Sequence, residues 1–264
     1  MFKKHYDRMR PGATPERVLA IARMIADKPL KTIEVAKLCE LKDDVSAPSE
    51  GVRYSINTAE ELGLIKSQGE KYEFIANPEV ISSPVRFRRY AAHRLLTNTE
   101  TTFFKVTEWF VSANADVLPI NTFATYAAEA VKSGIDHVDE NDILGWRFWA
   151  RFLGCAYQYG TTLIPNLCVR LQDAMQPFQA EQEIGSMEFL NWLKKNVPEA
   201  ASSCSQTELC LAVSNGLRTL KDLGKIDIIS ANDAEKVHMY PLDGVRLNDF
   251  SSILVKEAMH NELD

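Results

Sequence analysis

The stretch that decides the fold is VRYSINTAEELGLIKSQGEKYEFI, residues 52–75. Val52, Ile56, Ala59 and Leu62 recur at helical spacing and give this segment one apolar stripe. A glycine follows where a helix C-terminus favours a left-handed backbone, and a polar turn then precedes a short β-like run. A helix that ends in Leu-Gly and leads into a small hairpin predicts a winged helix.

Two further helical patterns precede this stretch. Pro15 suits the first position of a helix, and Thr32 suits the cap of a second one. The dipeptide Asn77-Pro78 then closes the unit. We therefore expect an N-terminal domain, residues 1–80, with the complete order of a winged helix.

The same order returns near the other end of the chain. LAVSNGLRTLKDLG (211–224) runs into KIDIIS (225–230) and then EKVHMYPL (235–242), whose alternating apolar residues predict strands. Residues 250–259 are expected to form a final helix. These patterns predict a second winged helix in a C-terminal domain, residues 181–264.

Residues 81–180 are predicted to form a helical middle domain, and the polar segment 179–185 a linker. The helix ILGWRFWARFLGCAY (143–157) also ends in Leu-Gly. An alternative interpretation is that the middle domain is a degenerate winged helix whose wing has been lost. The expected fold class is mainly α, with winged-helix units at both ends and a helical middle region.

Gross composition excludes several classes of protein. The 264 residues contain no apolar run of about 18, so no transmembrane helix is expected. The N-terminal residues lack the apolar core of a signal peptide, and we expect a cytoplasmic location. Five cysteines without a CxxC pair argue against a disulfide framework or a zinc knuckle, and most are expected to be buried.

The chain lacks the common catalytic motifs, including the P-loop, GxGxxG, HExxH and GxSxG. Its acidic segment 136–142 could coordinate a hard cation, but the spacing is not that of an EF-hand. We interpret that segment as a solvated loop that caps the next helix. The sequence therefore predicts a non-enzymatic protein without catalytic residues, metal site or cofactor.

Charge places any phosphate-binding surface in the first half of the chain. The net charge is −6, and residues 181–264 carry eight basic against fourteen acidic side chains, which accounts for all of it. Basic residues concentrate in segment 1–31 and in the expected helix 84–96. Such clusters can bind DNA phosphates without reading sequence. The candidate DNA contacts are Lys3, Lys4, Arg8, Arg10, Arg53, Asn57, Lys66, Lys71, Arg86, Arg88, Arg89 and Arg94.

The third helices of the two expected winged helices have mixed polarity, and neither is a convincing reader of bases. The acidic surroundings of the C-terminal copy favour protein contact, with Asn215, Arg218 and Lys221 as candidate partner-binding residues. A group of aromatic residues in the middle domain could stack on bases, but their helical spacing favours a core. The group comprises Trp146, Phe148, Trp149, Phe152, Tyr157 and Tyr159.

The order of several short motifs resembles the accessory winged-helix proteins called DpdG, from bacterial islands that insert and police 7-deazaguanine bases in DNA. The motifs are TPERVLAIARMIADKP, an EWF segment, W-x-RFLG with a later LIPN, FLNWLKKNVP and S-x-GLRTLKDLG. The chain departs from that pattern where LIPN replaces Pro-Asp-Pro and VPEAASS replaces a glycine-containing turn.

The resemblance implies a non-catalytic, DNA-associated adaptor subunit of a DNA-modification, restriction or anti-phage defence complex. Its partners would be other protein subunits, a nuclease or an ATPase, together with non-specific DNA, and neither a membrane nor a small-molecule cofactor. Tandem winged helices are also similar to small subunits that dock on SMC-type ATPases, which is one alternative. A winged-helix transcriptional regulator that controls its own operon is the alternative from another class.

Overall fold

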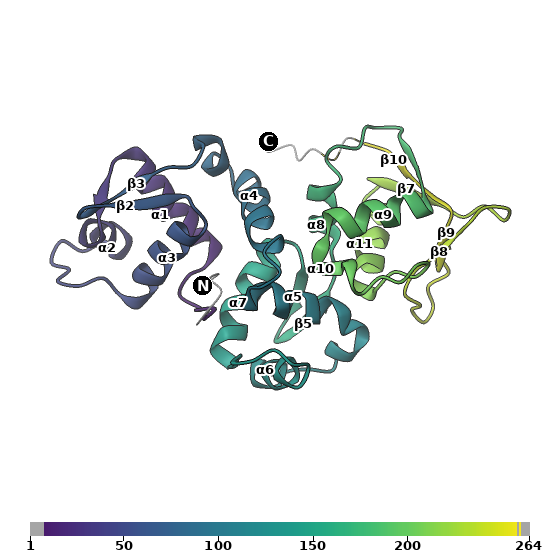
Figure 1. The fold of residues 1–264 in the computed structure, drawn as a ribbon, viewed down its shortest axis with the longest axis horizontal. Helices are drawn as coiled ribbons and strands as arrows, with labels where there is room; N and C mark the ends of the chain where they lie inside the picture. The colour runs from purple at the N-terminus through teal and green to yellow at the C-terminus, as the bar shows by residue number, and fades with distance from the viewer. Residues whose placement is uncertain (1–7, 258, 260–264) are drawn as a thin grey trace. The chain divides into compact units, whose positions relative to one another are not determined.

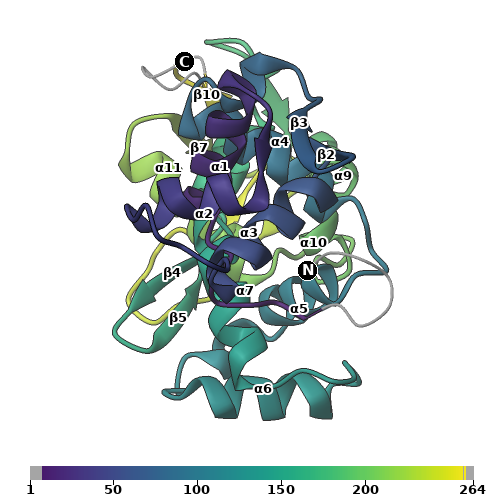
Figure 2. The same cartoon turned by 90° about the vertical axis from the view of Figure 1, so that its left-hand side faces the viewer.

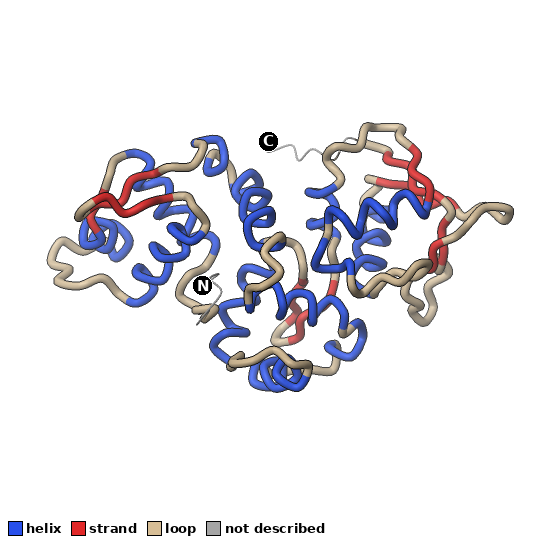
Figure 3. Tube along the Cα trace, in the orientation of Figure 1, coloured by secondary structure: helices blue, strands red, loops and turns tan. Residues whose placement is uncertain are grey.

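The structure, a computed structural model, describes residues 8–257 and residue 259. Within these residues the chain is mainly α-helical, with short strands between the helices (Figures 1 and 3). The chain forms two compact units. The N-terminal unit contains residues 8–104 and 123–152, and the C-terminal unit contains residues 105–122 and 153–257. The division into domains at residues 80 and 180 stays a prediction.

The N-terminal unit begins with three helices and a three-stranded antiparallel sheet of order β1-β3-β2. The three helices pack together, and the β2–β3 hairpin lies beside them (Figure 2). The elements are α1 (Pro15–Asp27), β1 (Leu30–Lys31), α2 (Thr32–Glu40), α3 (Glu50–Glu61), β2 (Ile65–Gln68) and β3 (Lys71–Phe74).

Local sequence explains this part of the fold. Pro15 occupies the first turn of α1, where a missing N–H costs nothing, and the Thr14 hydroxyl accepts from the backbone N–H of Arg17 at 3.5 Å. The apolar stripe of α3 is buried through Val52, Ile56 and Ala59. Gly63 then takes a positive φ of 73°, and β2 follows at once. The predicted helix and hairpin are confirmed.

The rest of the N-terminal unit is built around α7. The indole Nε1 of Trp149 donates to the carbonyl of Ala13 at 2.7 Å, and the Phe87 ring lies 6.2 Å from the Trp149 ring. The segment before α1 is therefore held against the core of this unit. Its further elements are η1 (Pro78–Ile81), α4 (Pro84–Leu96), α6 (Phe123–Lys132) and α7 (Glu140–Phe152), while α5 (Thr102–Ser112) runs from one unit into the other.

The C-terminal unit combines helices with three small antiparallel sheets, of orders β4-β5, β6-β10-β7 and β8-β9. Helix α11 packs on α8 and on strand β7. The elements are η2 (Asn114–Val117), β4 (Ala156–Tyr159), β5 (Thr162–Pro165), α8 (Cys168–Ala174), β6 (Glu183–Gly185), α9 (Ser186–Asn196), α10 (Pro198–Ala201), α11 (Leu211–Asp222), β7 (Ile226–Ile229), β8 (Val237–His238), β9 (Asp249–Phe250) and β10 (Ser252–Val255).

Three local predictions are wrong. Residues 250–259 form no helix in their described part, because β10 pairs with both β6 and β7. The expected linker 179–185 contains β6, one of those partners. The alternative of a degenerate winged helix without a hairpin after helix 143–157 does not hold, since β4 and β5 form a hairpin there. In each case the strand-pairing partner lies elsewhere in the chain, or the strand is too short to show the alternation of apolar residues that marks a strand in sequence.

None of the helices in the described part of the chain is both long and apolar enough to cross a lipid bilayer.

Candidate nucleic-acid interface

Strand register places three lysines on one face of the N-terminal sheet. Lys71 pairs directly with Lys31 of β1 on one side and with Gln68 of β2 on the other. Lys66 pairs with Glu73, two residues further along each strand. Directly paired residues, and residues two apart on a strand, share a face. Lys31, Lys66 and Lys71 therefore lie on the same face, with Glu73 as the acid among them.

The opposite face of this sheet turns toward the helices. Leu30 and Ile65 are buried there, and strand β3 packs on α1. Lys66 and Lys71 are exposed. The face that carries the three lysines is consequently the solvent face of the sheet. We name it the lysine face and define it by Lys31, Lys66 and Lys71.

One charge of the lysine face is already paired. The Lys31 ammonium forms an ion pair with Glu70 in the β2–β3 turn. The hydrogen bond and the charge of Glu70 raise the pKa of Lys31, and the same contact lowers the pKa of Glu70. Both side chains are thus charged at neutral pH, and Lys66 and Lys71 supply the remaining positive charge.

Helix α3 contributes a second, mixed surface. Arg53 is 57% exposed and only 4.0 Å from the Glu50 carboxylate, a weak contact, and Asn57 is exposed one turn further on. The Arg10 guanidinium lies 5.6 Å from the centre of the Tyr54 ring, a cation–π distance. Arg10 therefore lies against α3 at Tyr54, and Arg53 and Asn57 lie one turn apart on the same helix.

Helix α3 is tied to the hairpin at its end. The Glu60 carboxylate accepts from the backbone N–H of Ser67 in β2 at 3.3 Å. This contact fixes the edge of the hairpin against the last turn of α3. It also adds negative charge beside Asn57, which reduces the attraction of α3 for phosphate.

Arg8 has an internal role. Its guanidinium forms ion pairs with Asp139 and, at 3.1 Å, with Asp142. Burial lowers the pKa of Arg8, but the hydrogen bonds and charges of these two carboxylates outweigh burial and raise it. A DNA-binding role for Arg8 stays a prediction, and it would have to compete with this pairing. Lys3 and Lys4, the other candidates near the N-terminus, lie outside the described residues.

The acidic segment 136–142 caps α7, as the sequence predicts. The backbone N–H of Asp139 donates to the Asp142 carboxylate at 3.1 Å, and the N–H of Asp142 donates to Asp139 at 3.0 Å. The Asp142 carboxylate also accepts from the N–H of Met9 at 2.9 Å. Burial is the main cause that raises the pKa of Asp142. The carboxylates of Asp139 and Asp142, which cap α7, also hold the segment before α1 through Arg8 and Met9.

The arginines of α4 all make contacts within the chain. Arg86 forms an ion pair with Glu79, and Arg88 and Arg89 also interact within the chain. The Arg94 Nε donates to the carbonyl of Leu62 at 3.1 Å, and the Tyr90 hydroxyl donates to the same carbonyl at 2.7 Å. Because Leu62 is the C-cap of α3, Tyr90 and Arg94 satisfy that helix end. DNA contact by α4 stays a prediction.

The candidate partner-binding residues of α11 differ in whether they bind other parts of the chain or face solvent. Asn215 donates to the carbonyl of Pro165 at 3.0 Å. Arg218 donates to the carbonyls of Tyr240 at 2.8 Å and Leu247 at 3.0 Å, and burial lowers its pKa. Lys221 is exposed. Asn215 and Arg218 therefore hold the C-terminal unit together, and Lys221 is the one of the three that faces solvent.

Sequence reasoning missed three side chains. Lys31 joins the lysine face through a two-residue strand that no sequence pattern reveals. Arg147 lies between the rings of Phe123 and Phe148, at 4.6 and 4.7 Å, and burial followed by the charge of Arg151 lowers its pKa.

The third is Tyr159, which the sequence places in the aromatic group expected to form a core but which is 83% exposed at the tip of the β4–β5 hairpin. Trp146 and Trp149 are fully buried, as a core assignment requires, whereas Tyr157 is 42% exposed. The core interpretation therefore holds for the tryptophans and is wrong for the two tyrosines.

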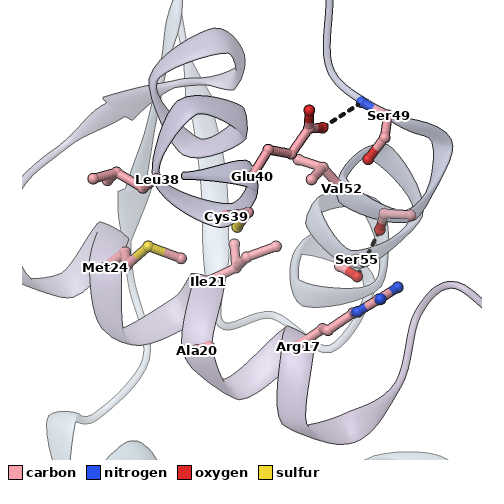
Figure 4. A pocket seen from close by; sticks show the side chains of 11 residues that line it. Arg17, Ala20, Ile21, Met24, Leu38, Cys39, Glu40, Ser49, Val52 and Ser55 are labelled. Carbon is pink, nitrogen blue, oxygen red and sulfur yellow. Dashed lines mark hydrogen bonds between the residues drawn. The ribbon is translucent and has the colours of Figure 1, made fainter. Parts of the chain in front are cut away.

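A pocket of about 370 Å³ lies among α1, α2 and α3 (Figure 4). Ile21, Met24 and Leu38 give it an apolar wall, and Arg17 lies at one end. The Glu40 carboxylate accepts from the backbone N–H of Ser49 at 3.1 Å, which closes the gap between α2 and α3.

Across the described residues, no cluster of three or more His, Cys, Asp or Glu side chains is arranged to hold a metal ion. The chain matches no family model, no curated protein and no solved structure in the three comparisons made.

Proposed function

We propose that the chain is a non-catalytic, DNA-associated adaptor subunit whose N-terminal helices and sheet form a winged helix. The carrying observation is the lysine face, where three lysines from three strands share one solvent-facing surface. A winged helix uses its hairpin to contact phosphate while its third helix lies along a groove. The exposed Arg53 and Asn57 on α3 fit the second of these tasks.

The charge distribution supports weak, sequence-blind binding. Two unpaired lysines and Arg53 can neutralise a small number of phosphates, and each such contact adds a salt-dependent contribution to the affinity. Glu50, Glu60 and Glu73 lie among them and oppose a close approach of DNA. Specific reading of bases would need more amide and guanidinium groups than Asn57 and Arg53 provide on this surface.

The adaptor role rests on the C-terminal unit. Lys221 is exposed at the end of α11, and Leu223 directly after it is 61% exposed. An exposed aliphatic side chain beside a charge is compatible with the apolar core and polar rim of a protein-binding surface. The resemblance to DpdG implies that the partner is a subunit of a DNA-modification, restriction or anti-phage defence complex, which is a further part of this proposal.

Fluorescence anisotropy with a labelled random duplex tests the DNA-binding part. We expect Lys66→Glu with Lys71→Glu to weaken binding, because both charges sit on the lysine face. The matched control is Lys105→Glu with Lys195→Glu, which changes net charge equally at exposed sites of the C-terminal unit. Equal loss of affinity in both variants would reject the lysine face as the DNA surface.

The adaptor part is tested by copurification with the products of neighbouring genes. Lys221→Glu with Leu223→Ser should reduce recovery of a partner subunit while leaving DNA affinity unchanged. A chain that instead binds one DNA sequence as a symmetric dimer, with no copurifying subunit, would be a transcriptional regulator, and the adaptor proposal would be wrong.

A further inference from the structure

Two cysteines of the C-terminal unit lie side by side. The sulfurs of Cys204 and Cys210 are 4.0 Å apart, at van der Waals contact. The two residues are 5% and 2% exposed, between α10 and α11. In the sequence, six positions separate the two cysteines and no CxxC spacing marks them as a pair.

The backbone around this pair is held on both sides. The Lys194 ammonium donates to the carbonyl of Ser205 at 2.9 Å, and the Leu209 N–H donates to the carbonyl of His238 at 2.8 Å. The N–H of Leu211 donates to the Asn114 side chain at 2.7 Å. Both cysteines are therefore fixed near one another. A disulfide needs sulfurs about 2.05 Å apart, so the two side chains must rotate toward one another to form it.

The two thiols are chemically unequal. The contact between the two sulfurs is the main cause that lowers the pKa of Cys204, and the charge of the nearby Lys194 adds to it. The same contact and burial raise the pKa of Cys210 well above its ordinary value. A thiolate is the reactive form of cysteine, so Cys204 is the nucleophile of the pair and Cys210 the resolving thiol.

We propose that Cys204 and Cys210 form a reversible intramolecular disulfide with a peroxide as oxidant. The Cys204 thiolate attacks one peroxide oxygen, so that an S–O bond forms, the O–O bond breaks and the departing hydroxide takes up a proton to become water. The Cys210 sulfur then attacks the Cys204 sulfur, which forms the S–S bond and breaks the S–O bond. The departing hydroxide takes the Cys210 proton, and two thiols and one peroxide have become one disulfide and two waters.

The other cysteines provide internal comparisons. Cys39 is exposed on α2, and burial is the main cause that raises its pKa. Cys155 and Cys168 are buried, and burial raises the pKa of Cys168 to about 11. All three should stay reduced under oxidation that converts the pair, because their thiolates form less readily.

Hydrogen peroxide treatment of the folded full chain, followed by blocking of free thiols and mass spectrometry of tryptic peptides, tests the proposal. Peptide 196–218 contains both cysteines and no internal cleavage site. We expect it to lose two hydrogen atoms, to carry no blocking group, and to regain both thiols with dithiothreitol. Retention of both thiols, or oxidation of Cys204 to a sulfinic acid without a disulfide, would overturn the proposal.

Two variants test the assigned order of the thiols. Cys210→Ser should accumulate a sulfenic acid at Cys204 that dimedone labels, and Cys204→Ser should leave Cys210 as a thiol. The opposite labelling pattern would contradict the assignment of Cys204 as nucleophile. Cys39→Ser is the matched control and should form the disulfide as the unmodified chain does.

Discussion

The backbone of Met9 lies directly against Gly145 of α7. A Cβ placed on Gly145 would be 1.9 Å from the Met9 carbonyl oxygen and 2.4 Å from its carbonyl carbon, both far inside van der Waals contact. Glycine at this position allows the segment before α1 to cross the helix, where Asp142 then binds the Met9 N–H. The position of Arg8 and Arg10 therefore depends on a residue more than 130 positions away in sequence.

Gly145→Ala should displace that segment and destabilise the protein by about 1–3 kcal/mol, the usual cost of overpacking a close contact. Urea denaturation measures the change. Gly185→Ala is the control, because a Cβ there meets nothing within 4 Å and the residue does not have a positive φ. Equal stability of the two variants would show that the close contact at Gly145 contributes nothing to the free energy of unfolding.

The ion pair between Arg170 and Glu199 is buried, with the Arg170 Nε 2.7 Å from the Glu199 carboxylate and Glu199 fully inaccessible. Arg170→Met leaves a buried carboxylate without its partner and should cost about 3–5 kcal/mol. Arg170→Met combined with Glu199→Met should recover most of that loss, because no charge stays buried. A double variant as unstable as the single one in urea denaturation would contradict this account.

Tyr90 and Arg94 make equivalent contacts with the Leu62 carbonyl. Tyr90→Phe and Arg94→Gln should each lower stability by about 1 kcal/mol, the typical net value of one hydrogen bond. If this structural role is the main one, DNA affinity should change little in either variant. A loss of DNA affinity in Arg94→Gln alone, at unchanged thermal stability, would instead support direct contact of α4 with phosphate.

We expect Asp249 to make the stability of the C-terminal unit sensitive to acid. The hydrogen bond from the Ser230 hydroxyl is the main cause that lowers the pKa of Asp249, with Lys236 adding to it. Because the pKa of Asp249 is lower in the folded state than in the unfolded state, its ionised carboxylate stabilises the folded protein at pH values above the ordinary pKa of 3.8. This stability is lost as the pH falls through the folded-state pKa.

Asp249→Asn should therefore reduce the dependence of stability on pH below about pH 4. Urea midpoints at pH 7 and pH 3 measure it, with Asp243→Asn at an exposed loop position as the control. An unchanged acid dependence in Asp249→Asn would show that this carboxylate is not a source of it.

Sequence pattern was sufficient for elements that local residues determine. The stripe of α3, the turn at Gly63 and the cap of α1 at Thr14 are all set by neighbours within one or two turns. Strand β10 was missed because Ile253 and Val255 find their partners in β7, more than 20 residues earlier. Helical periodicity and a short strand are hard to separate in such a segment without knowledge of its partner.

The same limit applies to the candidate interface. Exposure of Lys66 and Lys71 follows from the hairpin that the sequence predicts, but Lys31 joins them only through its pairing with β3. Arg86 and Arg94 looked available as part of a basic helix, because Glu79 and the Leu62 carbonyl are not visible as their partners in sequence. Counting charges locates basic segments, and tertiary contacts decide which of those charges face solvent.

The salt dependence of DNA binding tests the central claim most directly. The dissociation constant for a random duplex is measured over a series of salt concentrations for the unmodified chain, for Lys66→Glu with Lys71→Glu, and for Lys105→Glu with Lys195→Glu. Because each phosphate contact contributes about one to the slope of log affinity against log salt, we predict a slope smaller by about two in the lysine-face variant and unchanged in the control. An equal slope in all three proteins would contradict the lysine face as the DNA-binding surface.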